Sequence, residues 1–185
     1  SDNALTWKQF TDICVKIQSY FGMEKNNDKF YAIPYYELSS AIWSNNADYF
    51  DENAMHSTIS SDEFCETIEW LWDLMYTYKV VPKSTGDSAQ NMFLARNAAF
   101  CWVGPYLTPM YHQQKMNYRL LPVPYNGENA DARSTTWIGT LGLAISKSTK
   151  SPAAALALMK YLSLNESAQK DFYTRGQLIP NLKSM

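Results

Sequence analysis

Residues 135–162 read TTWIGTLGLAISKSTKSPAAALALMKYL, and this stretch decides the fold. The apolar run from Trp137 to Ser146 predicts a buried β-strand. The polar residues after it predict a turn. Ser151-Pro152 then predicts the start of a helix that continues to Leu162, because proline is favoured in the first helical turn. A buried strand that leads through a short turn into a helix is typical of α/β domains.

The rest of the chain continues this alternation of short apolar runs and helical patterns. Thr6 and Gln9 form a capping box that opens a helix, which Gly22 closes. Further helices are predicted at 38–44, 60–78, 88–96, 105–113, 151–162 and 163–176, the last opened by a capping box at Ser163–Glu166. Strands are predicted at 30–35, 98–103, 118–123 and 137–146, with a hairpin within 47–60. This order predicts an α/β fold with helices on both faces of its sheet.

Composition restricts the class of protein. The 185 residues are 46% hydrophobic and 18% charged, with a net charge of −2, which predicts a globular chain without a basic face for nucleic acid. Aromatic residues reach 15%, and we expect most of them in the core and a surplus in a binding cleft. The sequence has no run of about 18 apolar residues and no signal-peptide pattern. We therefore expect a mature product or a piece cut at a domain edge.

The cysteines and histidines do not form a recognisable site. Cys14, Cys65 and Cys101 are odd in number and lack CxxC spacing, so we predict three buried free thiols. His56 and His112 lie far apart and show no metal-ligand spacing. We predict neither a metal nor a cofactor.

Known catalytic motifs are missing too. The sequence has no GxSxG, no GxxxxGK[ST] and no GxGxxG pattern. Glu37 is the one acid whose context suggests a cleft, and it is expected to be either a helix cap or a binding residue. The triplet around Gly139 and Gly142 permits the close approach either of a ligand or of a packed helix.

Four motifs in order resemble one family. They are TWKQF at 6–10; WSNN at 43–46 with YFDE at 49–52; FLARNAAF at 93–100 with GPY at 104–106; and GTLGLAISK at 139–147 with SPAAA at 151–155. Together they resemble the extracellular solute-binding proteins of bacterial ABC importers, which bind sugars and oligosaccharides. The chain departs from the family pattern at Arg96-Asn97, where Gly-Lys is usual, at Tyr106 for Trp, and at Thr140 for Gly.

The resemblance implies a fold and a function. It implies a lobe of the type II periplasmic-binding-protein kind, with a mixed sheet flanked by helices. Residues 1–147 would form the second lobe, and 148–185 a helical segment that packs on a first lobe this chain lacks. The protein would bind a mono- or oligosaccharide outside the cytoplasm, in the periplasm or as a surface lipoprotein, and deliver it to an ABC permease without catalysis. Apolar helix faces predict that the fragment dimerises through Leu156, Leu158, Met159, Leu162 and Phe172.

The resemblance also implies a binding site at strand ends. The residues expected to contact the ligand are Tyr35, Tyr36, Glu37, Trp102, Tyr106, Trp137 and Gly139. Tyr106 is the strongest candidate because the family often stacks a Trp there, whereas Trp102 faces either the cleft or the core, with the core favoured. Two other hypotheses remain open: an α/β enzyme such as a glycosidase or transferase, which needs a second acid near Glu37, and a sensor or adaptor domain.

Overall fold

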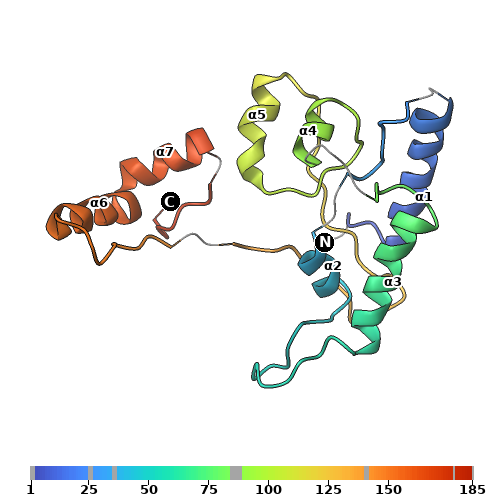
Figure 1. Ribbon diagram of the computed structural model, residues 1–185, viewed down its shortest axis with the longest axis horizontal. Coiled ribbons are helices and arrows are strands. Elements are labelled where there is room, and N and C mark those ends of the chain that lie inside the picture. The colour runs from blue at the N-terminus through green and yellow to red at the C-terminus, as the bar shows by residue number, and fades with distance from the viewer. Residues whose placement is uncertain are drawn as a thin grey trace. The chain divides into compact units, whose positions relative to one another are not determined.

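The computed structural model describes residues 3–24, 27–34, 37–83, 89–139, 142–176 and 178–184 (Figure 1). The α-helices in these ranges are α1 (Trp7–Gln18), α2 (Leu38–Trp43), α3 (Asp62–Tyr76), α4 (Ala89–Leu94), α5 (Thr108–Gln113), α6 (Pro152–Leu164) and α7 (Glu166–Gly176). A π-helical turn, Ser19–Glu24, follows α1, and a 3₁₀ turn, Pro105–Leu107, precedes α5. The chain divides into two compact units. One comprises Ser1–Val103 with Tyr118–Trp137, and the other Gly104–Asn117 with Ile138–Met185.

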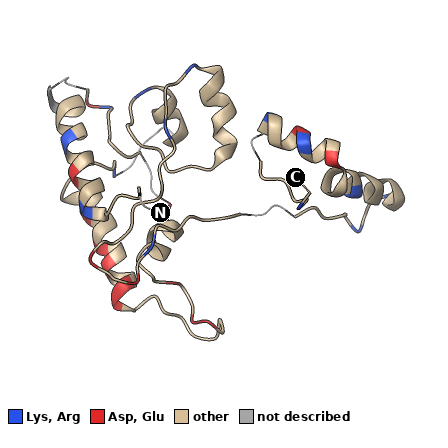
Figure 2. Cartoon of the chain, turned by 180° about the vertical axis from the view of Figure 1, so that it is seen from behind, with Lys and Arg blue, Asp and Glu red and all other residues tan. Residues whose placement is uncertain are grey.

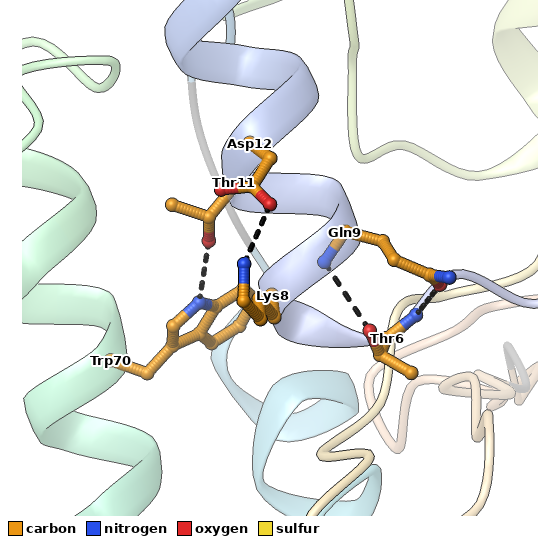
Figure 3. A network of polar contacts seen from close by, with 6 residues as sticks. All are labelled: Thr6, Lys8, Gln9, Thr11, Asp12 and Trp70. Atoms are coloured by element: carbon orange, nitrogen blue, oxygen red, sulfur yellow. Dashed lines mark hydrogen bonds and ion pairs between the residues drawn. The ribbon is translucent and has the colours of Figure 1, made fainter.

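Local capping chemistry sets the start of the first helix as predicted. Thr6 accepts a hydrogen bond from the backbone N–H of Gln9, and the Gln9 side chain accepts one from the backbone N–H of Thr6 (Figure 3). These two bonds satisfy donors that the first turn of a helix otherwise leaves open. An ion pair of 2.9 Å between Lys8 and Asp12 lies one turn further along (Figure 3).

The core of the first unit packs α1 against α3 with an extended segment between them. Its buried members are Phe10, Cys14, Ala32, Ile33, Ala41, Leu71, Leu74, Val80 and Val81. Trp7 and Trp70 stack at its edge, with ring centroids 4.4 Å apart. The indole N–H of Trp70 donates to Thr11 on α1 at 3.1 Å, which fixes the contact between the two helices (Figure 3).

The cysteines differ from one another in burial. Cys14 is fully buried in this core, and its burial raises the pKa of the thiol to about 12, so that it stays neutral. Cys65 on α3 is exposed and Cys101 is half-buried. The prediction that all three are buried is therefore wrong for Cys65, because α3 turns that side chain away from the core.

The predicted strands pair less regularly than the sequence indicates. Tyr31 forms a parallel bridge with Ala98, and Ile33 donates to the carbonyl of Val80 at 3.1 Å, so segment 30–34 does lie between two neighbours. The N–H groups of Ala99 and Phe100 both donate to the carbonyl of Ala32. Because the carbonyl of Ala32 accepts from two successive N–H groups, the pairing of these two segments cannot continue as a regular β-ladder. The hairpin within 47–60 is confirmed by an antiparallel bridge between Phe50 and Ser57.

The predictions of a strand at 118–123 and of a buried strand at 137–146 are wrong. The described residues of both segments form no β-bridge. Their large side chains are mostly exposed: Leu120 76%, Leu121 51%, Ile138 76% and Leu143 53%. An extended segment needs a neighbouring strand for its backbone hydrogen bonds and a packed face for its side chains. The described part of the chain offers these segments neither.

The two C-terminal helices form a helical pair. α6 buries none of its residues, and Leu156, Leu158 and Phe172 are exposed as predicted, whereas Met159 and Leu162 are half-buried. Ser163 lies inside α6, so its prediction as the cap of the last helix is wrong. Asn165 takes that role instead, and its side chain accepts from the N–H of Ala168 at 3.1 Å.

A buried polar centre follows α2 and holds distant parts of the first unit together. Asn45 is completely buried, and its amide nitrogen donates to the carbonyl of Glu63 at 2.7 Å and to the carboxylate of Glu66 at 3.2 Å. The amide of Asn129 donates to both oxygens of Asn45, at 2.9 and 3.1 Å. The start of α3 and the loop around residue 129 are thus fixed to the end of α2.

We expect Asn45→Ala to lower the free energy of unfolding by about 2 kcal/mol, because Asn129 and the carbonyl of Glu63 lose their buried partner. Asn53 is exposed on the hairpin and provides the control, with an expected change from Asn53→Ala within about 0.5 kcal/mol. Urea unfolding followed by circular dichroism measures both. Equal stability of the two variants would contradict the role assigned to Asn45.

Candidate functional site

Glu37 is the N-cap of α2, one of the two roles that its sequence context suggested. Its carboxylate accepts from the backbone N–H of Ser39 at 3.1 Å and of Ser40 at 2.7 Å. The hydroxyl of Ser40 donates to the same carboxylate at 2.6 Å. A negative charge at a helix N-terminus is also favoured by the helix dipole.

These contacts set the charge state of Glu37. Partial burial on its own raises the pKa of the carboxyl group, but the hydrogen bonds from Ser40 and Ser39 outweigh it. The pKa therefore lies below its ordinary value, and the side chain is ionised at neutral pH. A carboxylate held in this state accepts hydrogen bonds and is unsuited to act as a general acid.

Ser40 of α2 and Ser44, which directly follows this helix, connect the cap to segment 135–137. The backbone N–H of Trp137 donates to the hydroxyl of Ser40 at 3.1 Å. One turn later, the hydroxyl of Ser44 accepts from the N–H of Thr135 at 3.0 Å and donates to the carbonyl of Thr135 at 3.1 Å. Both serines are almost completely buried. Ser40 thus joins Glu37 and Trp137, two residues that are 100 positions apart in the sequence.

Ser40 and Ser44 were not among the residues expected at the site. Their spacing of four residues places them on one face of the short helix, which was a usable signal. Buried serine hydroxyls within and at the end of this six-residue helix need partners, and an extended segment can supply backbone donors and acceptors.

The other candidates lie in different surroundings. Trp137 is 57% exposed, and Gly139 is exposed beside it in the sequence. Trp102 is half-buried and packs against the core of the first unit, in agreement with the favoured prediction that it faces the core. Tyr35 and Tyr36 lie outside the described residues.

Tyr106 belongs to the second unit, in the 3₁₀ turn Pro105–Leu107, and is 59% exposed. Its ring lies against Gly104. A Cβ atom at Gly104 would come within 2.5 Å of Tyr106 Cε1, so a larger residue there would displace the ring. The absence of a side chain at Gly104 thus leaves room for the Tyr106 ring in this position.

Among the described residues, no group of three or more His, Cys, Asp or Glu side chains is arranged to bind a metal ion. No helix in the same ranges combines the length and hydropathy that a membrane crossing requires.

Comparison with known proteins places the chain in a family. The family model for the bacterial extracellular solute-binding proteins matches residues 4–169. The chain belongs to this family. No curated protein matches the chain significantly. The family is defined by solute binding, and its description implies a location outside the cytoplasm.

Solved structures are similar to this chain over nearly its whole length. The ABC substrate-binding protein Lmo0181 from Listeria monocytogenes, in complex with cycloalternan, has a TM-score of 0.77 at 19% identity, covering 98% of this chain and 46% of that chain. The maltose/maltodextrin-binding domain MalE from Bdellovibrio bacteriovorus, bound to maltotriose, gives 0.80 at 17%, covering 98% and 49%. Maltose-bound T. maritima MalE3 gives 0.79 at 21%, covering 98% and 48%.

These likenesses confirm the predicted fold class, a lobe of the type II periplasmic-binding-protein kind. The chain spans about half the length of the solved structures that it matches.

The role of Glu37 as a charged cap predicts a pH-dependent contribution to stability. We expect Glu37→Gln to destabilise the chain by about 1 kcal/mol at pH 7. The pKa of Glu37 is lowered on folding, so the stabilisation is present above the unfolded-state pKa and is lost as the pH falls through the folded-state pKa. The difference between wild type and variant should therefore shrink toward pH 3.

Chemical denaturation at pH 7 and at pH 3 measures this difference. Glu69→Gln, on the exposed side of α3, provides the matched control and is expected to have little effect at either pH. A Glu37→Gln difference that stays the same at both values would contradict the charged cap.

Proposed function

We propose that this chain is the second lobe of a two-lobed protein that binds a mono- or oligosaccharide outside the cytoplasm and delivers it to the membrane subunits of an ABC importer. The family match over residues 4–169 carries the proposal. Similar solved structures carry cycloalternan, maltotriose and maltose, and a further one from Thermotoga lettingae carries α-D-tagatose. All four ligands are carbohydrates, which favours a carbohydrate over a peptide or an amino acid.

The chemistry of the exposed aromatic residues supports this ligand class. A sugar ring has an apolar C–H face and a rim of hydroxyl groups, so its binding sites combine aromatic rings with a few polar groups. Tyr106 and Trp137 are exposed aromatics of this kind, with the backbone of Gly139 beside Trp137 in sequence. We propose these residues as ligand contacts, together with Tyr35 and Tyr36. Glu37 would act mainly by holding Ser40 and therefore segment 135–137.

We further propose different roles for two parts of the chain. Residues 1–147 form the second lobe, and the helical segment 148–185 packs its exposed apolar side chains on the first lobe. In the isolated chain, the same side chains favour a homodimer. The protein binds and releases its ligand without catalysis, and closure of the two lobes around the ligand is what the permease detects. It resides in the periplasm or on the cell surface as a lipoprotein.

A thermal-shift screen of the full-length protein tests the ligand class. We expect at least one carbohydrate among maltotriose, cycloalternan and tagatose, or a related sugar, to raise the melting temperature. A ligand at 100 times its Kd stabilises the folded state by about 2.7 kcal/mol, which is readily detected. Stabilisation by amino acids or peptides with none from any sugar would refute the carbohydrate proposal.

Tyr106→Ala tests the stacking role, once a stabilising sugar is known. We expect a loss of affinity of about tenfold, or ~1.4 kcal/mol, measured by calorimetry. Gly104→Ala should cause a smaller loss in the same direction, because its added Cβ displaces the Tyr106 ring. Phe50→Ala, at a hairpin side chain of similar exposure, is the control and should bind normally. Full affinity in Tyr106→Ala would contradict the assignment.

A further inference from the structure

Helix α3 carries more apolar side chains than it buries in the core. Phe64 and Leu71 are buried, as an apolar helix face should be. Ile68, Trp72 and Tyr76, spaced four residues apart, are instead 41%, 59% and 38% exposed. These three side chains form a second apolar row on the outer side of the helix, which we call the outer face of α3.

The two aromatic rings of this outer face stack on each other. The ring centroids of Trp72 and Tyr76 are 4.0 Å apart with an interplanar angle of 28°. The ammonium group of Lys83 lies 5.1 Å from the centroid of the Tyr76 ring, a cation–π contact. The Tyr76 end of the aromatic pair therefore already binds a cation from the same chain.

The Trp72 end has an open hollow beside it. The hollow has a volume of about 360 Å³ and is lined by Ile68, Glu69, Trp72 and Asp73. It thus combines one indole, one aliphatic side chain and two carboxylates. Glu69 has no hydrogen bond or ion pair within the described residues, and the Asp73 side chain accepts from the hydroxyl of Thr77.

The charge of α3 is entirely negative. Residues 62–76 include five acids, Asp62, Glu63, Glu66, Glu69 and Asp73, and no lysine or arginine (Figure 2). Among the described residues none of the five takes part in an ion pair, since the two ion pairs there lie on α1 and α7. The acids beside the hollow are therefore available to an external cation.

We propose that the outer face of α3 is a docking surface for a partner protein that presents an arginine or lysine within an apolar segment. The cationic group would lie over the indole of Trp72 and bond to Glu69 and Asp73, while a neighbouring apolar side chain covers Ile68. Aromatic and carboxylate groups together suit a guanidinium better than any other side chain. This inference does not depend on the identity of the transported ligand.

Other occupants fit the hollow less well. The negative charge of α3 repels nucleic acid and anionic lipid. A neutral sugar can stack on Trp72 but gains nothing from the charge of two adjacent carboxylates, and it would bind independently of salt concentration. Charge complementarity therefore selects a basic partner, and the strength of that binding should fall as salt is added.

Fluorescence anisotropy tests the proposal with a labelled 14-residue helical peptide that carries arginine and leucine on one face. We expect it to bind the full-length protein at low salt, and Trp72→Ala to weaken binding about tenfold. The double variant Glu69→Gln/Asp73→Asn should weaken binding and reduce its salt dependence. Glu128→Gln/Asp131→Asn removes two exposed charges from another loop and should leave binding unchanged.

A peptide with citrulline in place of each arginine isolates the role of the charge. It keeps the shape of the side chain and should bind at least about tenfold more weakly. Circular dichroism of each variant checks the fold, which exposed positions should preserve. Equal peptide affinity of wild type, Trp72→Ala and the double variant would overturn the proposal.

Two further outcomes would also overturn it. Trp72 shielded from acrylamide quenching in the full-length protein, with no peptide bound, would mean that the protein's own chain covers this face. Self-association at micromolar concentration that Trp72→Ala abolishes would mean that the occupant is a second copy. Failure of the sugar screen would leave these results unaffected, so the two proposals fail separately.

Discussion

The buried side chain of Asn45 is the interaction on which the first unit depends. It lies just after α2, where Asn46 adopts a positive φ of 58° and ends the helix. A buried amide must have partners for both its oxygen and its nitrogen, since an unpaired polar group in the interior is costly. Glu63, Glu66 and Asn129 supply them. The position of one asparagine therefore constrains the start of α3 and a loop more than 80 residues away in sequence.

The candidate site is built on that constraint. Once residue 129 is held near Asn45, the following segment runs along α2, and Ser44 and Ser40 bond to Thr135 and Trp137 in turn. Glu37 then orients Ser40 from the start of the same helix. The exposed indole of Trp137 is thus presented by a segment whose backbone is fixed by buried hydroxyls. Such a supporting layer lets a surface residue contact a ligand with little loss of conformational freedom.

The accuracy of the sequence predictions varied with the range of the interactions involved. Capping residues and apolar periodicity located the helices well, because those signals act within four residues. The strand predictions were less successful, since apolar segments such as 137–146 indicate burial but do not supply the neighbour that buries them. The apolar stripe of α3 shows the same limit: its width is visible in sequence, but only packing determines that Leu71 is inside and Trp72 outside. Glu37 was recognisable as a cap or a site residue, whereas Ser40 and Ser44 were not predicted, although their spacing of four residues was a usable signal.

By itself, the sequence determined most of the helices and, through four ordered motifs, the family. These depend on local hydrogen bonding, on apolar periodicity and on motif order, all of which are properties of the linear chain. The tertiary structure alone decided that Asn45 is the polar centre, that Ser40 joins Glu37 to Trp137, and that α3 keeps an acidic aromatic face exposed. The physical reason is that each of these features depends on contacts with residues that lie tens of positions away in the sequence. Hydrogen bonds and burial across such distances are set by packing and leave no local signature.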